Sequence, residues 1–182
     1  MRVISGMAKG RKLAAPAGGT TRPTADYVKE NIFNIVQFDI EGASVLDLYC
    51  GSGQLGLEAI SRGAAGAVFV DMSSSAIACV RQNIKTLDFG DKCRVIPGEV
   101  LQFLAGYKEG ADLIFLDPPY ETALTDKTLA RVAEFDILRP GGIMICECSR
   151  KEQPAPLPPP YKRVKRYDYG AKSVIMYVRE TD

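Results

Sequence analysis

The chain has 182 residues, of which 46% are hydrophobic, a formal net charge of +1 and no histidine. This length suffices for one substantial core, so we expect a single domain over residues 1–182, with a basic arm at 1–24 and an α/β core at 25–182. Without histidine, Ser-His and Cys-His nucleophile systems and most catalytic zinc sites are excluded, and no metal is expected. The net charge excludes neither an enzyme nor a nucleic-acid-binding protein.

The sequence shows neither a membrane span or leader segment nor a cysteine pattern typical of zinc sites or disulfides. No apolar run approaches the roughly 20 residues that span a bilayer, and no basic segment followed by an apolar one opens the sequence. We therefore expect a soluble, cytoplasmic protein without a membrane partner. The cysteines contain no C-x-x-C pair and lie mostly in apolar runs, which favours reduced, buried thiols over zinc ligands or disulfides: Cys50, Cys79, Cys93, Cys146 and Cys148.

The first 24 residues form a basic segment. They carry no acidic side chain and five prominent basic ones: Arg2, Lys9, Arg11, Lys12 and Arg22. Short β-prone pieces at 2–4 and 12–15, separated by glycine, predict a flexible β-hairpin arm. Such an arm is either merely solvated or a contact for a polyanion, and the sequence leaves both open. Thr24 then fits the N-cap of a helix that ends near Phe38.

From Ser44 onward, short apolar strands alternate with amphipathic helices. The pattern predicts strands at 45–49, 67–71, 94–97, 113–116 and 143–148, and helices at 54–62, 74–87, 100–105 and 125–135. Strands that are apolar on both faces and separated by single helices are typical of a parallel sheet covered on both sides. A doubly wound α/β fold follows. After a proline-rich connector at 153–160, strands at 162–168 and 173–178 are predicted to pair antiparallel, because their connection is too short for a crossover helix.

The first chemical signal is the stretch from Ser44 to Gly56, SVLDLYCGSGQLG, which predicts a strand, a tight loop and a helix. Glycines there allow positive φ and close approach of a ligand, and the free amides of the helix start face the same pocket. The glycines satisfy G-x-G-x-x-G, and Asp71 lies near the spacing of a ribose-binding carboxylate. A dinucleotide oxidoreductase is therefore a genuine alternative.

Acidic residues at strand ends favour a different ligand. They lie where open α/β sheets bind ligands: Asp47, Asp71, Glu99 and Asp117. A pyrophosphate beside Asp47 would be repelled, at a cost on the order of a few kcal/mol. S-adenosylmethionine instead offers a ribose for Asp71, cationic groups for the Asp47 end, and no phosphate.

The second chemical signal is the run Asp117-Pro118-Pro119-Tyr120 after a predicted strand. The prolines fix their own φ and donate no N–H, so the corner is rigid and rich in acceptors. The Asp117 carboxylate and the Pro118 carbonyl can accept hydrogen bonds from one NH₂ group, and Tyr120 offers a flat face for stacking. Two acceptors would aim the nitrogen lone pair at a methyl donor. A bare D-P-P is most simply a loop, but beside the glycine-rich loop it predicts methylation of a nucleobase amine.

These motifs resemble the class I S-adenosylmethionine-dependent methyltransferases that act on exocyclic amines, whose signature is (D/N)PP(Y/F). The order MRVISG, GRKL, RPT, VKENIFN, LDLYCGSGQLGLEA and DPPY is similar to the RsmD-type family of bacterial 16S ribosomal RNA guanine-N2 methyltransferases. The resemblance implies a Rossmann-like, mostly parallel seven-stranded sheet with one antiparallel strand. It also implies S-adenosyl-L-methionine as cofactor, S-adenosyl-L-homocysteine as product, and a guanine amino group of 16S rRNA, free or in the small subunit, as substrate. We expect the protein to be a monomer.

The resemblance also places roles on residues. It implies a cofactor site formed by Asp47, Tyr49, Gly51, Gly53, Asp71, Met72, Glu99, Val100 and Asp117, in which Asp71 holds the ribose and Met72 lies beside the adenine. It implies that the target amine is positioned by the catalytic corner Asp117, Pro118, Pro119 and Tyr120. RNA contacts are expected from Arg2, Lys9, Arg11, Lys12, Arg22 and Thr24, with the arm reading phosphates rather than sequence. Glu99 stands where the class more often has Asp, and Asp71 where many relatives have Glu.

DPPY alone does not distinguish RNA from DNA. A DNA adenine or cytosine amino-methyltransferase therefore stays open, as does a nucleotide-binding RNA adaptor without turnover. A cysteine-dependent C5 methyltransferase is disfavoured, because that chemistry needs an exposed thiol.

Overall fold

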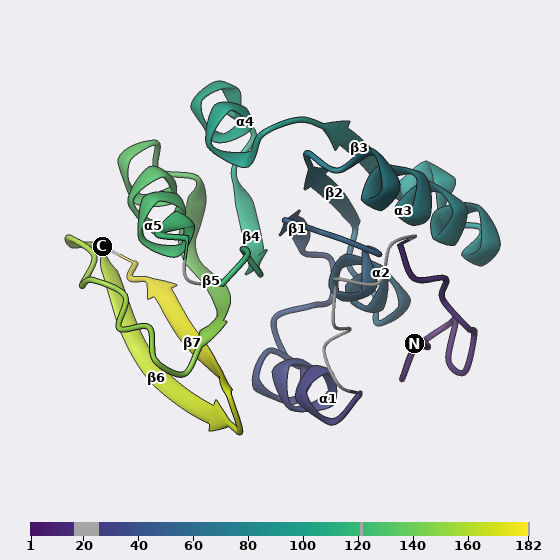
Figure 1. The fold of residues 1–182 in the computed structure, drawn as a ribbon, viewed down its shortest axis with the longest axis horizontal. Helices are drawn as coiled ribbons and strands as arrows, with labels where there is room; N and C mark the ends of the chain where they lie inside the picture. The colour runs from purple at the N-terminus through teal and green to yellow at the C-terminus, as the bar shows by residue number, and fades with distance from the viewer. Residues whose placement is uncertain (17–25, 121, 182) are drawn as a thin grey trace.

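The computed structural model describes residues 1–16, 26–120 and 122–181. The predictions for Arg22 and Thr24 therefore lie outside the described residues. Figure 1 shows a sheet with helices on both of its sides. The strands are β1 (Ser44–Leu48), β2 (Gly66–Asp71), β3 (Cys93–Pro97), β4 (Ala111–Leu116), β5 (Leu138–Ser149), β6 (Tyr161–Tyr169) and β7 (Lys172–Arg179). The helices are α1 (Asp26–Ile35), α2 (Gln54–Ser61), α3 (Ser74–Leu87), α4 (Val100–Gly106) and α5 (Leu124–Glu134), with a short 3₁₀ turn at Gly90–Lys92.

The described strands form one seven-stranded sheet in the order β3-β2-β1-β4-β5-β7-β6. Strands β1 to β5 pair in parallel, whereas β7 pairs antiparallel with both β5 and β6. The predicted α/β class, the mostly parallel sheet and the antiparallel closing pair are confirmed. The antiparallel β7 departs from the all-parallel 3-2-1-4-5-6 order of dinucleotide-binding folds.

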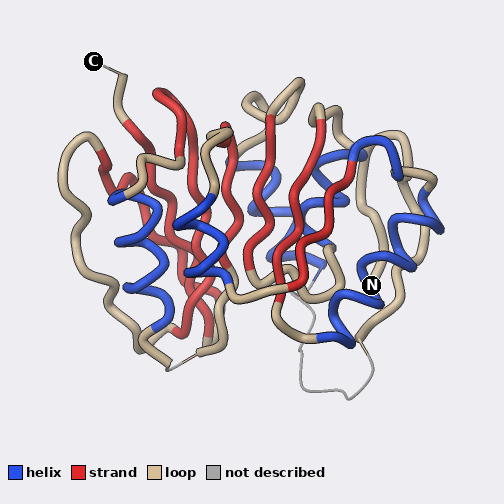
Figure 2. The backbone as a smooth tube through the Cα atoms, turned by 90° about the horizontal axis from the view of Figure 1, so that it is seen from above, coloured by secondary structure: helices blue, strands red, loops and turns tan. Residues whose placement is uncertain are grey.

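Two apolar layers cover the sheet, as the alternating side chains of each strand require. Val45 points to the layer that contains α1, α2 and α3, and the next residue, Leu46, points to the layer that contains α4 and α5. Figure 2 shows helices on either side of the strands. Both faces of the central strands are therefore buried, which explains why their sequences are apolar without alternation.

The amino-terminal arm agrees with its prediction in part. Within residues 1–16 a short hairpin is present, because Arg2 and Lys12 form an antiparallel bridge and the amides of Val3 and Leu13 donate to the carbonyls of Arg11 and Met1. It is not the flexible segment that was predicted, because Val3, Ala8 and Leu13 are buried in the core. Burial of the arm could not be predicted from the sequence, because its three core residues are separated by glycine and lysine and show neither strand nor helix periodicity.

The β6–β7 hairpin folds back toward the ligand-binding edge of the sheet. Lys172, the first residue of β7, lies opposite Ser149, the last residue of β5, and the turn between β6 and β7 uses Gly170 with a φ of 61°. Because β5 is parallel to β1 and β4, its carboxyl end lies at the edge where ligands bind in such sheets. The hairpin thereby adds Lys172 to this edge. In the described parts of the chain, no helix is both long and apolar enough to cross a membrane.

Candidate active site

The two predicted halves of the site lie on adjacent strands. In the register of the sheet, Leu48 of β1 is flanked by Val70 of β2 and Leu116 of β4. The Asp117 amide also donates to the Leu48 carbonyl across 3.4 Å. The glycine-rich loop after β1 and the DPPY corner after β4 therefore begin side by side.

The glycines of the loop serve different purposes. A Cβ on Gly53, whose φ is 75°, would lie 2.4 Å from the Val80 Cγ2 atom, and one on Gly56 would lie 2.4 Å from Phe69 Cε1. These two glycines are required for packing of α2 and the loop. Gly51 also has a positive φ of 54°, but a Cβ there meets nothing within 4 Å. The space beside Gly51 is open to a ligand, as the nucleotide-cradle interpretation requires.

Asp71 links the loops after β1 and β2. One carboxylate oxygen accepts from the Gly51 amide at 2.9 Å and the other accepts from the Ser73 amide at 2.8 Å. Since each carboxylate oxygen has a second lone pair, both can still accept from hydroxyl groups of a ligand. The next side chain, Met72, is 76% exposed, an unusual position for a large apolar group and one suited to covering a flat ring.

Asp47 is placed behind the loop. Its side chain is buried and accepts from the Gly56 amide at 2.8 Å, which fixes the start of α2. Burial, and secondarily the charge of Asp71, raises the pKa of Asp47 to about 8 despite the opposing effect of that hydrogen bond. Near neutral pH the carboxyl is largely protonated. The charge repulsion invoked against a pyrophosphate is therefore weaker than the sequence argument assumed, and the case against a dinucleotide depends on the fold and on DPPY.

The remaining predicted cofactor residues border the same edge. Tyr49, with a φ of 59°, places its hydroxyl 2.8 Å from the Thr128 hydroxyl of α5. Glu99 is exposed and caps α4 by accepting from the Gln102 amide at 3.1 Å, and Val100 behind it is buried. The longer Glu side chain thus has a structural role at the position where the class more often has Asp.

A buried ionic group holds the DPPY corner. The Tyr120 hydroxyl donates to Glu147 Oε1 at 2.7 Å, and Glu147 also forms an ion pair with Lys172. The Lys172 ammonium lies 5.5 Å from the centre of the Tyr120 ring. Pro119 is constrained as well, because its carbonyl accepts from the Thr122 hydroxyl at 2.7 Å. The predicted stacking side chain is therefore fixed by two residues that sequence reasoning missed.

Glu147 and Lys172 differ in how far their roles could be predicted from the sequence. Glu147 interrupts the apolar run Ile143–Cys148, and a charged residue within a buried strand is itself a signal, because burying an unpaired charge is costly. Lys172 gives no such signal, since its partners are 25 or more residues away in the chain.

The electrostatic environment of Asp117 is set by the same group. Burial raises the pKa of Asp117, the charges of Glu147 and Asp47 raise it further, and Lys172 opposes them. A carboxyl with a raised pKa binds a proton more strongly than an exposed one, which suits a group close to a reaction that releases a proton.

The predicted RNA-binding residues of the arm have different surroundings. All four described residues are exposed, but the Arg2 guanidinium lies 3.4 Å from Asp26 and the Arg11 guanidinium donates to the Thr86 carbonyl. Within the arm, Lys9 and Lys12 are thus better suited to phosphate contacts than the two arginines.

Asn83 of α3 connects the arm to the glycine-rich loop. Its Oδ1 accepts from the Ala14 amide at 2.8 Å, and its Nδ2 donates to the Ser52 carbonyl at 2.9 Å. The arm is therefore linked to the glycine-rich loop through the Asn83 side chain.

The chemistry of the loop fits S-adenosylmethionine. Open space beside Gly51 and the acceptors on Asp71 suit a ribose, and the exposed Met72 suits an adenine. The side-chain oxygen of Gln54, at the start of α2, is buried and has no partner among the described residues, as expected of an acceptor next to a ligand with N–H or O–H groups. In the same described ranges, no group of three or more His, Cys, Asp or Glu side chains could hold a metal ion.

The thiols offer no alternative chemistry. Cys50, Cys79, Cys146 and Cys148 are buried, Cys93 is half-buried, and none is in a disulfide. Burial raises the pKa of Cys50, the thiol in the glycine-rich loop, well above its ordinary value. A cysteine nucleophile of the C5-methyltransferase kind is therefore disfavoured by the structure as well.

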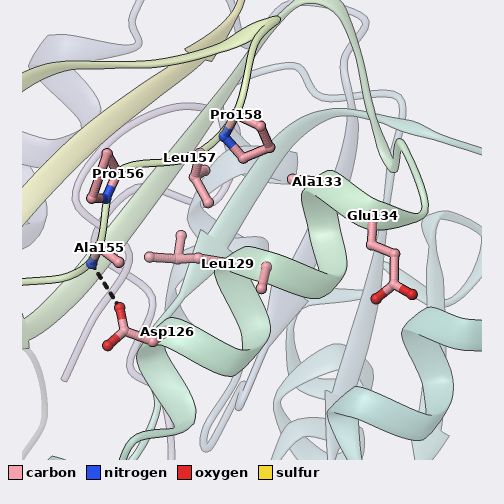
Figure 3. A pocket seen from close by; sticks show the side chains of 9 residues that line it. Asp126, Leu129, Ala133, Glu134, Ala155, Pro156, Leu157 and Pro158 are labelled. Atoms are coloured by element: carbon pink, nitrogen blue, oxygen red, sulfur yellow. Dashed lines mark hydrogen bonds between the residues drawn. The ribbon is translucent and has the colours of Figure 1, made fainter.

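A groove on the outer side of α5 is separate from this site. It has a volume of about 340 Å³, and Figure 3 shows its lining side chains between the helix and the proline-rich connector. Asp126 accepts from the Ala155 amide at 2.9 Å across it. None of the predicted site residues lines this groove, whose side chains are mostly those that pack the connector on α5.

The sheet with its antiparallel β7, the glycine-rich loop after β1 and the DPPY corner after β4 together define a class I methyltransferase. The model of the family described as "Conserved hypothetical protein 95" matches residues 1–178. The chain belongs to this family, the RsmD family.

Relatives agree with this membership. Ribosomal RNA small subunit methyltransferase D of Haemophilus influenzae is 31% identical over 180 residues, covering 97% of this chain and 93% of its own length. The Escherichia coli protein of the same name is 39% identical over 129 residues, covering 71% of this chain and 65% of its own. The solved structure of Escherichia coli yhhF has a TM-score of 0.90 and 32% identity, covering 100% of this chain and 99% of that one. An RNA methyltransferase from Salinibacter ruber, solved with S-adenosyl-L-homocysteine, shares the fold at 16% identity and a TM-score of 0.67, over 88% of this chain and 95% of that one.

Proposed function

We propose that residues 1–182 form a single methyltransferase domain. It transfers the methyl group of S-adenosylmethionine to the exocyclic N2 amine of a guanine in 16S ribosomal RNA, and it acts as a monomer on the RNA or on the small-subunit particle. Family membership supports the general activity, and relatives named for small-subunit rRNA support the substrate class. The observation that carries the proposal is the position of the DPPY corner directly beside the glycine-rich loop, where the Asp117 amide donates a hydrogen bond to the Leu48 carbonyl.

The cofactor half of the site is proposed to use the loop and the two strand ends beside it. Asp71 would accept from the ribose hydroxyls, because each of its oxygens accepts one backbone amide, from Gly51 or Ser73, and keeps a second lone pair. Met72 would cover the adenine, and Glu99 with Val100 would border its amino group. Asp47 would act mainly by holding the Gly56 amide, with Tyr49, Gly51 and Gly53 shaping the space for the methionine end.

The substrate half performs the alignment. Asp117 and the Pro118 carbonyl would accept the two N–H groups of the guanine amine, which aims the nitrogen lone pair away from them and toward the loop. The bound S-adenosylmethionine supplies an electrophilic methyl group on a positively charged sulfur. Once methylated, the nitrogen would carry an excess proton, and Asp117, whose pKa is raised by burial, would accept that proton.

Target access requires that the guanine amine be unpaired. A base inside a duplex is stacked and its amine is hydrogen-bonded, so it has to be extruded or taken from a single-stranded region. Tyr120 provides a half-exposed ring at the corner to hold such a base.

The decisive experiment compares labelled methyl transfer to naked 16S rRNA, to the assembled small subunit and to DNA, followed by nucleoside analysis. The proposal expects N2-methylguanine from one or both ribosomal substrates. Label on a ring nitrogen or carbon would refute the amine mechanism, and preferential transfer to DNA would favour a DNA amino-methyltransferase. Saturable cofactor binding without transfer to any substrate would favour a nucleotide-binding adaptor. Light scattering during the assay tests the monomer.

A further inference from the structure

Glu147 is a buried acidic side chain near the carboxyl end of β5. It lies on β5, is 1% exposed, and its Oε1 accepts from the Tyr120 hydroxyl at 2.7 Å. The same oxygen is paired with the ammonium of Lys172 from β7. The chain therefore brings a buried carboxylate, an ammonium and the last residue of DPPY together from three separate segments.

Lys172 adds a second constraint on the tyrosine. Its ammonium lies over the Tyr120 ring, 5.5 Å from the ring centre, while its side chain is only 19% exposed. A cation at this distance from an aromatic face is attracted to it. Tyr120 is consequently held at its hydroxyl by Glu147 and at one ring face by Lys172.

Stability alone is a weak explanation for this arrangement. Two charges lose hydration when they are buried, and apolar residues of similar volume often stabilise a fold as well or better. A tyrosine on a loop and 39% exposed has, in contrast, much rotamer freedom to lose. Fixing that side chain is useful where a ring has to meet a substrate in one orientation.

We propose that Glu147 and Lys172 form a positioning pair that fixes the orientation of Tyr120, and with it the platform for the target base. This inference rests on the proposed function of the DPPY corner. Because Lys172 occupies one face of the Tyr120 ring, the target base stacks on the opposite face. Neither Glu147 nor Lys172 touches the reacting atoms in this role; both act through Tyr120.

The pair also sets the field at Asp117. The charged and titratable groups that interact with Asp117 are Glu147 and Cys146 from β5, Lys172 from β7, Asp47 from β1 and Tyr120 from its own loop. Glu147 and Lys172 act in opposite directions on the pKa of Asp117. Removing one or the other charge therefore gives opposite shifts, which a purely structural role would not produce.

The test uses the full chain with Tyr120→Phe, Glu147→Gln and Lys172→Met, and Glu109→Gln as the matched control. The control breaks an exposed ion pair with Arg94, 2.8 Å long and remote from the corner in the register of the sheet. Each of the three site variants should lose roughly tenfold in kcat/KM for the ribosomal substrate, while the Kd of S-adenosylhomocysteine stays within about threefold. Glu109→Gln should change neither quantity.

Two readouts separate positioning from a general loss of structure. Because Gln at position 147 keeps an oxygen that can accept from Tyr120, the additivity test uses Glu147→Leu. In the double variant Tyr120→Phe with Glu147→Leu, the losses of the two single variants should not multiply, because each change alone removes the hydrogen bond between these side chains. The acid limb of the pH–rate profile should move to lower pH in Glu147→Gln and to higher pH in Lys172→Met. If the Glu147 variants do not fold, Tyr120→Ala with Lys172→Met gives an equivalent additivity test, because Tyr120→Ala removes the ring that Lys172 contacts, and Lys172→Met should then cause no further loss.

The outcomes distinguish this proposal from the proposed function. Unchanged kinetics in the three variants, or losses that multiply, would overturn the positioning pair while methyl transfer by the wild-type protein still stands. No methyl transfer by the wild-type protein to any RNA would overturn the proposed function and the pair together.

Discussion

Lys29 of α1 and Glu58 of α2 form an ion pair of 3.4 Å in which both side chains are completely buried. The Lys29 ammonium also donates to the Arg2 carbonyl at 2.5 Å. Glu58 accepts from the amides of Ile4 and Ser5 at 2.8 and 2.9 Å. This pair therefore attaches the amino-terminal arm to both α1 and α2. The first turn of α2 also borders the glycine-rich loop.

Removing the acidic partner should be strongly destabilising. Glu58→Ala removes the charge partner of the buried Lys29 and of Arg62, and the acceptor of two arm amides, so the free energy of unfolding should fall by about 3–5 kcal/mol. Urea unfolding followed by circular dichroism measures this. Glu109→Ala, which breaks an exposed pair with Arg94, should change it by less than about 1 kcal/mol. Equal effects of the two substitutions would contradict a special role for the buried pair.

The alternation of strands and helices was predictable because both faces of the parallel strands are buried. β1 through β4 were predicted to within a few residues, since their apolar runs are short and end at glycine, proline or acidic residues. The antiparallel pair β6–β7 followed from a connection too short for a crossover. The longer course of β5, which begins at Leu138, could not be predicted, because it contains Pro140 and two glycines and its pairing with β4 shifts register.

The two halves of the candidate site were also predictable, whereas their supports were not. Asp71 and Asp117 are local signals, each directly after an apolar strand. The docking of the arm depends on Glu58, more than 50 residues away, and the fixing of Tyr120 depends on Glu147, 27 residues away. Such contacts arise from the folded topology and leave no periodicity in the sequence.

Gly51 and Gly53 should respond differently to alanine. In Gly51→Ala the new Cβ meets no atom within 4 Å, so the protein should fold with a loss of about 1–2 kcal/mol from its positive φ. The affinity for S-adenosylhomocysteine should fall at least about tenfold if the ligand occupies the space beside Gly51. Calorimetric titration measures this, and unchanged affinity would place the ligand elsewhere.

Gly53→Ala should instead impair folding. Its Cβ would lie 2.4 Å from Val80 Cγ2, in addition to a φ of 75°. Overpacking of this kind costs about 1–3 kcal/mol, to which the positive φ adds. A thermal unfolding temperature equal to that of Gly51→Ala would contradict the packing role of Gly53.

Asp47 should make stability depend on pH in an unusual direction. Its pKa rises from 3.8 to about 8 on folding, so the native state binds a proton that the unfolded state has released. Stability should therefore fall as pH rises from about 4 to about 8, with a slope of up to about 1.4 kcal/mol per pH unit from this group.

Asp47→Asn is the matched variant, because its side-chain oxygen can still accept from the Gly56 amide. The difference in unfolding free energy between the wild-type protein and this variant, measured in urea across that pH range, isolates the contribution of Asp47. A difference that does not change with pH would show that Asp47 is ionised in the native state.

Asp117 should be required for turnover rather than for cofactor binding. In Asp117→Ala one acceptor for the target amine is lost, so kcat should fall by at least about 100-fold while the Kd of the cofactor stays within about tenfold. Single-turnover methyl transfer and calorimetry measure the two quantities. Because Asp117 is close to Glu147 and Asp47, its removal should not weaken folding. An unfolded variant would instead identify Asp117 as a structural residue.

Lys9 and Lys12 should contribute to RNA affinity through phosphate contacts, whereas Arg11 should contribute less. Both lysines are exposed, while Arg11 is engaged with the carbonyl of Thr86 in α3. Substituting both lysines by alanine should weaken RNA binding and reduce the slope of log K against log salt by about 1.4, or about 0.7 for each contact to single-stranded RNA. Arg11→Ala should leave that slope within experimental error. Filter binding at several salt concentrations provides the comparison, and equal slopes for the wild-type protein and the double lysine variant would remove the arm from the RNA interface.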